Sequence, residues 1–238
     1  LGCRPEEVYF LSCGTEGDNW AIAAAVEKNR RKGKHIITTA IEHAAVLEPI
    51  RELERQGYEV TWLQPDQQGI ITAEQVEAAL KKAPEIKTIC ITSPTYAGAL
   101  SDIPAIAGVV HAHGGKLVVD GAHGAHLKFL GMDAYRGADA VVVSAHETLP
   151  AMGQAALLFT NGIDPEQVRR TAAIYGTSSP SYPILASLDT AREWLEGPGA
   201  GEYGRVARRT AALRCRFPSL CPPLPLDPTR FTLKVKNG

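Results

Sequence analysis

The chain has 238 residues, of which 45% are apolar and 21% are charged, a balance typical of globular proteins and unlike that of disordered or fibrous ones. Its 25 basic and 26 acidic side chains give a formal net charge of -1, so no long-range field would attract nucleic acid or an anionic membrane. We therefore expect small-molecule chemistry, with neither a nucleic-acid nor a membrane partner.

The predicted elements alternate between short β-rich runs and longer helical patterns over the first two thirds of the chain. The predicted strands are residues 8–11, 35–39, 59–63, 88–92, 116–120, 140–144 and 155–159. The predicted helices are residues 19–32, 44–56, 73–82, 103–113, 182–196 and 202–216. This order predicts an α/β fold, a three-layer sandwich with a mainly parallel seven-stranded sheet.

The end of the chain is rich in proline and contains one possible strand, residues 231–236, which would need partners that this chain does not supply. We expect a large domain over residues 1–200 and the start of an incomplete, truncated small domain over residues 201–238.

The five cysteines are odd in number and include no CxxC pair, which predicts neither a disulfide framework nor a zinc knuckle. A reducing compartment fits this pattern best. No apolar run is long enough to span a bilayer, and the opening LGCRPEEVYF has no charged leader followed by a hydrophobic segment. We therefore expect a cytoplasmic protein.

Polar residues follow several of the predicted strands, where ligands collect in an open parallel sheet. The segment SCGTEGDN follows the first strand and offers backbone N–H groups and a hydroxyl to a phosphate. A plain helix N-cap made by Thr15 or Asp18 is an equally good interpretation. His43 begins the helix after the second strand and by itself indicates little.

Asp120 ends an apolar run and would be a costly buried carboxylate without a cationic partner, such as a protonated pyridine nitrogen. His123 and His126 could instead bind a metal together with His111 and His113, but no acidic or cysteine ligands flank them, so we expect no metal. Polar residues also end the sixth strand, in the segment SAHETLPAMGQ, for which a structural turn is the alternative.

Together these segments resemble the large domain of fold-type-I pyridoxal-phosphate enzymes. Residues 1–70, with LSCGTEGDNWAI, IEHAAVLEP and GYEVTWLQPDQQG, are similar to cysteine desulfurases of the class V aminotransferase group. Residues 71–233 resemble the Orn/Lys/Arg decarboxylase family more closely, in ITSPTYAGALSDI, VVDGAHGAHLKF, SAHETLPAMGQAALL, TSSPSYPILASLD and LDPTRFTL. The change near residue 70 leaves open a recombined or wrongly assembled gene.

The resemblance implies roles for individual residues around pyridoxal 5'-phosphate. On the phosphate side it assigns Gly14 and Thr15 to the cradling turn, and Ser144 and His146 to a second cluster. On the ring side it implies that His43 stacks on the pyridine, that Asp120 pairs with the ring nitrogen, and that His123 lies near the phenolic oxygen.

The main departure from both families is Glu147, which stands where they carry the lysine that forms a Schiff base with the cofactor. A carboxylate cannot form that bond, cannot move the proton that the amine moves, and would lie near the phosphate as a like charge. We expect normal turnover to be lost or nearly so, with the cofactor bound non-covalently if it is bound at all.

Two functions follow as hypotheses. The first is a pyridoxal-phosphate enzyme acting on a small amino acid, decarboxylase-type if the longer resemblance decides and desulfurase-type or aminotransferase-type if the first 70 residues decide. We favour the decarboxylase, because the resemblance to that family covers more of the chain, and no segment resembles the mobile cysteine loop of a desulfurase. The second is a catalytically dead cofactor-binding protein or decayed fragment. We expect a homodimer in either case, because similar enzymes build the site between two subunits.

Overall fold

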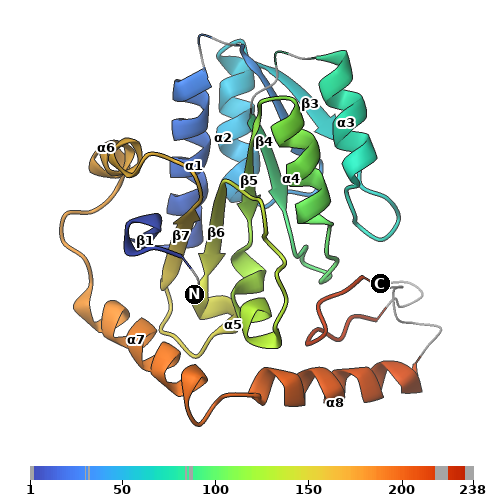
Figure 1. Ribbon diagram of the computed structural model, residues 1–238, viewed down its shortest axis with the longest axis vertical. Helices are drawn as coiled ribbons and strands as arrows, with labels where there is room; N and C mark the ends of the chain where they lie inside the picture. Colours follow the sequence, from blue (N-terminus) through green and yellow to red (C-terminus); the bar gives the residue numbers. More distant parts are fainter. Residues whose placement is uncertain are drawn as a thin grey trace.

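The computed structural model describes residues 3–29, 31, 33–83, 85, 88–217 and 225–233. Seven strands form one sheet (Figure 1) in the order β1-β7-β6-β5-β4-β2-β3. They are β1 (Val8–Leu11), β2 (His35–Thr39), β3 (Glu59–Leu63), β4 (Thr88–Thr92), β5 (Lys116–Asp120), β6 (Ala140–Ser144) and β7 (Ala156–Thr160). Only β7 runs antiparallel to its neighbours within this sheet, which confirms the predicted mainly parallel arrangement.

Helices cover both faces of the sheet (Figure 1). The α helices are α1 (Gly14–Asn29), α2 (Ala44–Arg55), α3 (Ala73–Lys82), α4 (Ile103–Ala112), α5 (Ala145–Thr148), α6 (Pro165–Tyr175), α7 (Tyr182–Glu196) and α8 (Glu202–Arg216), and the 3-10 helices are η1 (Pro5–Glu7) and η2 (Ala122–Leu130). Helix α1 packs against α2 and α6, and α3 packs against α4. None of the helices within the described ranges is long and apolar enough to cross a membrane.

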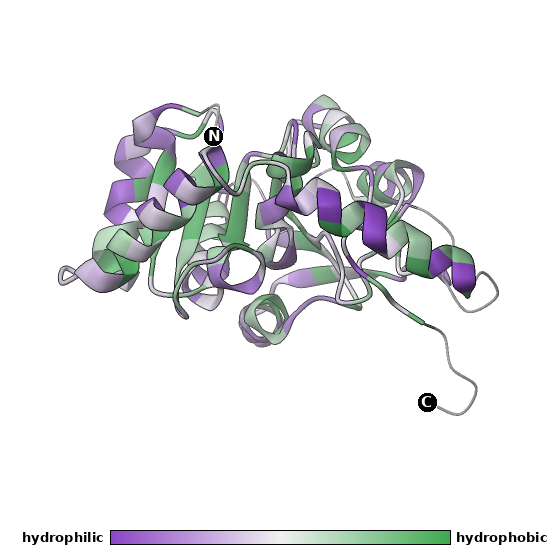
Figure 2. Ribbon diagram, turned by 90° about the horizontal axis from the view of Figure 1, so that it is seen from below, coloured by the Kyte–Doolittle hydropathy of each residue, from purple (hydrophilic) through white to green (hydrophobic). Residues whose placement is uncertain are grey.

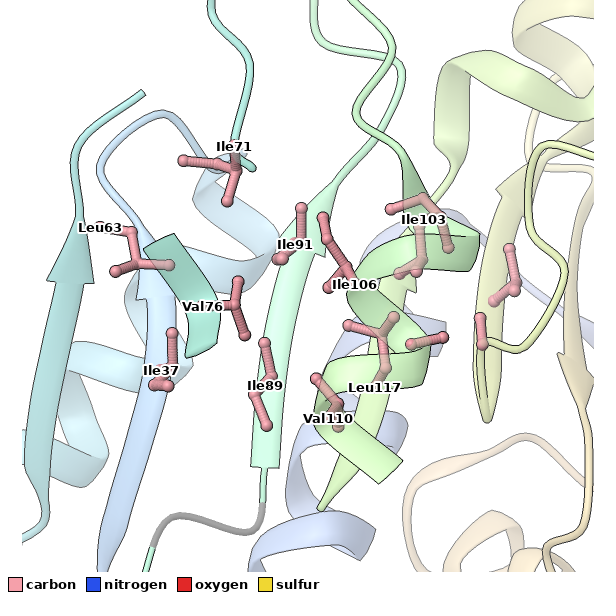
Figure 3. Packing of buried hydrophobic residues seen from close by; sticks show 14 of the residues in the cluster. Ile37, Leu63, Ile71, Val76, Ile89, Ile91, Ile103, Ile106, Val110 and Leu117 are labelled. Atoms are coloured by element: carbon pink, nitrogen blue, oxygen red, sulfur yellow. The ribbon is translucent and has the colours of Figure 1, made fainter. Parts of the chain in front are cut away.

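The core consists of two apolar clusters, one on each face of the sheet. Successive residues of a strand alternate between the clusters: Ile89 and Ile91 of β4 belong to the cluster under α3 and α4, and Cys90 belongs to the cluster under α1 and α2. Figure 3 shows the first cluster, in which Ile106 and Val110 of α4 lie over Ile89 and Leu117. Because both faces are covered, the strands need apolar residues at consecutive positions, which explains runs such as AVVVS.

Figure 2 shows the same layering by hydropathy, with hydrophobic strands between helices that carry hydrophilic segments. Helix α1 begins five residues before the expected start at residue 19. A hydrogen bond of 2.5 Å from the Ser12 N–H to the Glu16 carboxylate ties the first turn of this helix to the preceding loop. Helix α6 was not predicted from the sequence pattern, although Asp164 caps it and Pro165 occupies its first turn.

The segment 225–233 returns to the carboxyl end of the sheet. Leu226 forms an isolated bridge with Ala99, and the Asp227 N–H donates to the Gly98 carbonyl at 2.7 Å. The possible strand at residues 231–236 is not formed over residues 231–233, and residues 234–236 lie outside the described residues. This segment therefore packs on a loop near the sheet instead of extending the sheet.

Candidate functional site

The site residues expected from the sequence share one edge of the molecule, at or just beyond the carboxyl ends of parallel strands. They come from the ends of β1, β2, β5 and β6 and from the helices that follow: Gly14, Thr15, His43, Asp120, His123, Ser144, His146 and Glu147. The parallel sheet brings together residues that are up to 133 positions apart (147 minus 14).

The amino end of α1 and the end of β6 approach each other closely. A Cβ atom on Gly14 would lie only 2.5 Å from the Ser144 Oγ, so this contact requires glycine. Ser144 immediately precedes α5 but its hydroxyl makes no capping bond to that helix. The first-turn N–H groups of a helix have no partner inside the helix. This corner therefore offers a hydroxyl and backbone donors to an anion.

The alternative of a simple N-cap at the first turn is not supported. Thr15 and Asp18 both lie inside α1, and Asp18 is 2% exposed with no hydrogen-bond partner for its Oδ1 among the described residues. Burial raises the pKa of Asp18 well above its ordinary value, and the nearby Asp120 and Glu42 carboxylates add to this effect.

His146 and Glu147 occupy the short helix α5. The Nδ1–H of His146 donates to the Ala155 carbonyl at 3.0 Å, which fixes the ring. The other ring nitrogen, Nε2, lies 3.6 Å from Glu147 Oε1. Glu147 is partly exposed and acts electrostatically on His123. The position that the resemblance assigns to lysine thus holds a carboxylate that lies close to His146 and acts electrostatically on His123.

Three rings line the opposite side. His43 caps α2 by accepting a hydrogen bond from the Ala45 N–H on Nδ1, at 3.1 Å. The Tyr96 ring lies 6.2 Å from the His43 ring and 4.7 Å from the His123 ring, in the latter instance edge-on. Burial and the nearby Arg230 cation lower the pKa of His123, against the opposing effect of Glu147 and Asp120. A role for Tyr96 was not predicted from the sequence.

Asp120 is the buried carboxylate at the centre of the site, with 3% of its surface exposed. Its Oδ1 accepts the Ala122 N–H at 3.0 Å, and the Thr92 hydroxyl lies 3.5 Å from its Oδ2. Within the described ranges Asp120 forms no salt bridge. Burial raises its pKa, partly offset by the Ala122 N–H and by His43 and His123. The position suits a cationic ligand atom that the chain itself does not provide.

A second buried carboxylate, Glu42, was not predicted as part of the site. It is 5% exposed and accepts hydrogen bonds from the Thr39 hydroxyl at 2.6 Å and from the Thr92 N–H at 3.0 Å. The Thr92 hydroxyl lies 2.5 Å from its other oxygen. Burial raises the pKa of Glu42 to about 7, although these hydrogen bonds oppose the shift. The sequence signal that could have indicated Glu42 is its position directly before His43, shortly after an apolar strand.

Arg230 was also missed. Its guanidinium donates to the Tyr96 carbonyl at 2.7 Å and lies 3.7 Å from the Asp227 carboxylate, which is fully buried. Gly98 has a φ of +86° and lies directly under this side chain, where a Cβ atom would come within 3.0 Å of the Arg230 Cδ. The segment 225–233 thereby brings a cation to the mouth of the site.

The histidines considered as metal ligands do not converge. His126 is buried, and its Nε2 contacts Asp227 at 3.1 Å and Thr229 at 3.0 Å. His111 contacts Asp139 at 2.8 Å, and His113 contacts the Val109 carbonyl at 3.0 Å. Each of these three rings has its own structural partner, while His123 faces Tyr96.

Comparison with known proteins identifies the family. Aminotransferase class-V matches residues 1–168. The cysteine desulfurase IscS of Ectopseudomonas mendocina (strain ymp) is 34% identical over 225 residues, covering 91% of this chain and 54% of that protein. SspA in complex with cysteine is 27% identical, with a TM-score of 0.67 over 81% of this chain and 56% of that one.

DndA from Streptomyces lividans has a TM-score of 0.75 over 90% of this chain and 62% of that one, and at 24% identity this likeness concerns the fold. The large-domain fold expected from the sequence is thereby confirmed. The chain spans about half the length of the curated relatives that it matches.

The expectation of a decarboxylase is wrong. It depended on a change of family near residue 70, but the class-V match continues through residue 168 and the cysteine desulfurase match covers 91% of the chain. A gene junction near residue 70 is therefore not required. The misleading segments follow β4, β5 and β6 and recur near α7 and in residues 226–233, and likeness in such segments within a shared fold does not fix the reaction. The chain belongs to the class-V aminotransferase family.

Proposed function

We propose that this chain forms the pyridoxal-phosphate site of a cysteine-desulfurase-like protein, and that it holds the cofactor without a covalent bond. The observation that carries the proposal is Asp120, a carboxylate buried at the carboxyl end of β5 without a salt bridge among the described residues. Such a group needs a cationic partner or a proton, and the protonated nitrogen of a pyridine ring supplies the former.

The remaining residues fit the same cofactor. Gly14 leaves room for the Ser144 hydroxyl, and these two residues lie beside the amino end of α1, where a phosphate would find donors. His43 places an aromatic ring on a fixed helix cap near Tyr96. An anion cradle and a buried acid at one sheet edge match a ligand with a phosphate and a basic ring.

Bound pyridoxal phosphate would supply an electron sink for reactions at an amino-acid carbon. In this chain Asp120 would hold the proton on the ring nitrogen, and His43 would restrain the ring. Glu147 cannot form the covalent link that the family's lysine forms, and it cannot accept a proton from the substrate as a neutral amine does. We therefore propose that binding is retained and that turnover is blocked at this one residue.

The matched proteins support finer proposals. A small amino acid, with cysteine first, is the proposed substrate class, because one matched structure contains cysteine. We also propose a homodimer in the cytoplasm, in line with the four described free cysteines, and a large domain over residues 1–200 followed by the start of a small domain.

The test is a titration of the wild-type chain with pyridoxal phosphate, with Glu147→Lys and Glu147→Gln as matched variants. Equilibrium dialysis should show binding to all three proteins. Only Glu147→Lys should develop the absorbance of a covalently linked cofactor, and its spectrum should then change when cysteine is added. A linked cofactor in the wild type would refute the role of Glu147, and the absence of binding to every variant would refute the proposed function.

A further inference from the structure

Three buried carboxylates, two near the carboxyl ends of β2 and β5 and one on α1, exceed the single acid that one protonated ring nitrogen would require. Glu42, Asp18 and Asp120 are each at most 5% exposed, and no salt bridge to any of them occurs within the described part of the chain. Buried carboxylates normally have a cationic partner or a proton. The arrangement therefore needs an explanation beyond Asp120.

The connection between Glu42 and Asp120 runs through one residue, Thr92. Strand pairing sets Thr92 directly opposite Asp120 on β5. The Thr92 hydroxyl lies 2.5 Å from Glu42 Oε2 and 3.5 Å from Asp120 Oδ2, and the Thr92 N–H donates to Glu42 Oε1 at 3.0 Å. A hydroxyl carries one hydrogen, so it can donate fully to only one of the two carboxylates at a time.

We propose that Glu42 is a positioning residue that acts through Thr92 on Asp120 and makes this end of the pocket selective for a ligand whose ring nitrogen carries a proton. Binding of such a ring expels a proton from Glu42. The inference rests on the proposed function and extends it from one carboxylate to a pair.

The charges around Glu42 determine the sign of the effect. The pKa of Glu42 is raised to about 7 by burial, so this group is half ionised near neutral pH. The ionised form repels Asp120 and attracts a cationic ring, so a bound cation lowers the pKa of Glu42 and a proton leaves. By linkage, affinity for the cationic ring increases as Glu42 ionises.

Other titratable groups near the pair must be separated from Glu42. Asp18 on α1 is one such group: burial and the nearby Asp120 and Glu42 carboxylates raise its pKa, and the Asp18→Asn variant separates its contribution from that of Glu42. Burial also raises the pKa of the Cys90 thiol, well above the range in which it would ionise. The titratable groups that act on the pair from the surrounding elements include Asp18 of α1, Cys90 of β4, His43 at the start of α2, His123 of η2 and Tyr135 between η2 and β6.

The experiment is calorimetric titration of the whole chain with pyridoxal phosphate near pH 7, in two buffers of different ionisation enthalpy. Wild type should release protons on binding. Glu42→Gln, which keeps the shape and a hydrogen-bond donor but has no charge, should lose this release, and above pH 7 its affinity should fall about tenfold relative to wild type. Thr92→Val should weaken the coupling, and Asp18→Asn should leave it unchanged.

A cofactor analogue with carbon in place of the ring nitrogen completes the design. Its affinity should be the same for wild type and Glu42→Gln, because it has no cationic N–H. Equal proton release by wild type and Glu42→Gln, or equal discrimination against the analogue above pH 7, would overturn the inference. If no variant binds the cofactor, the proposed function fails instead. The proton on Glu42 then remains measurable by infrared titration of the free chain, and a carboxyl band titrating near pH 7 in Glu42→Gln as in wild type would also overturn the inference.

Discussion

Two buried aspartates on adjacent strands, at opposite ends of the sheet, have opposite surroundings. Asp139, at the amino end of β6, is 4% exposed and contacts the Lys116 ammonium at 2.6 Å, His111 at 2.8 Å and the Leu117 N–H at 2.9 Å. Asp120, at the carboxyl end of β5, is equally buried and has one close donor, the Ala122 N–H.

This difference distinguishes Asp139, whose carboxylate stabilises the fold, from Asp120, whose carboxylate remains available to a ligand. A buried carboxylate with a cation and several donors stabilises the fold only as long as all of its partners are present. A buried carboxylate without a cation reduces stability and is retained where a ligand completes it.

The largest expected effect on stability is that of replacing Asp139, the aspartate that pairs with Lys116. Asp139→Ala leaves the Leu117 N–H and the Lys116 ammonium without their acceptor, and we expect a loss of about 3 kcal/mol in the free energy of unfolding, measured by urea denaturation. As a control, Asp189→Ala removes an exposed ion pair with Arg192 and should change stability little. Equal losses in the two variants would contradict the distinction between structural and surface pairs.

Next in size is the pH dependence that Glu42 contributes to the free chain. Its pKa is about 7 in the folded state, against an ordinary value of 4.5, so the folded state binds more protons between these two values. Stability should therefore decrease as pH rises from about 4.5 to about 7, by roughly 3 kcal/mol in total. The measurement is the difference between wild type and Glu42→Gln in urea denaturation across this range, and a flat difference would contradict the raised pKa.

The fold was largely predictable because it depends on local patterns. Apolar strands at regular intervals and capped helices between them predicted all seven strands to within one residue, and also α2, α3, α4, α7 and α8. Helix α6 was missed although Asp164 and Pro165 form a recognisable helix start, and η2 was missed because nine residues of 3-10 helix have no periodic signature.

The site was predictable only in part. His43, Asp120 and Ser144 end or follow strands and so stand out from their apolar neighbours. Glu42 and Arg230 matter through contacts with residues 50 and 134 positions away, Thr92 and Tyr96, and the sequence gives no sign of such contacts. Tertiary packing determines them, and local patterns do not report it.

A smaller effect is expected at the anion corner. Gly14→Ala places a methyl group 2.5 Å from the Ser144 Oγ, and overpacking of this kind costs about 1 to 3 kcal/mol. We expect a lower melting temperature and weaker binding of pyridoxal phosphate. Gly108→Ala in α4 is the matched control, because no atom lies within 4 Å of the position that its methyl group would take, and the helix should gain up to about 1 kcal/mol. If Gly14→Ala binds the cofactor as wild type does, the corner is not the phosphate site.

The smallest change in stability, and the one that tests the comparison most directly, is expected for Asp120→Asn. Because burial raises the pKa of Asp120 and no cation offsets its charge within the described residues, an uncharged amide of the same shape should leave the free chain as stable as wild type or more stable, by about 1 kcal/mol. Asp139→Asn should have the opposite sign, since Lys116 and His111 would lose a charged acceptor. Cofactor affinity should fall for Asp120→Asn alone. The two substitutions should therefore change the free energy of unfolding in opposite directions, which requires that Asp139 serves the fold and Asp120 serves a ligand. A loss of stability in both variants would mean instead that Asp120 has a structural partner in the free chain.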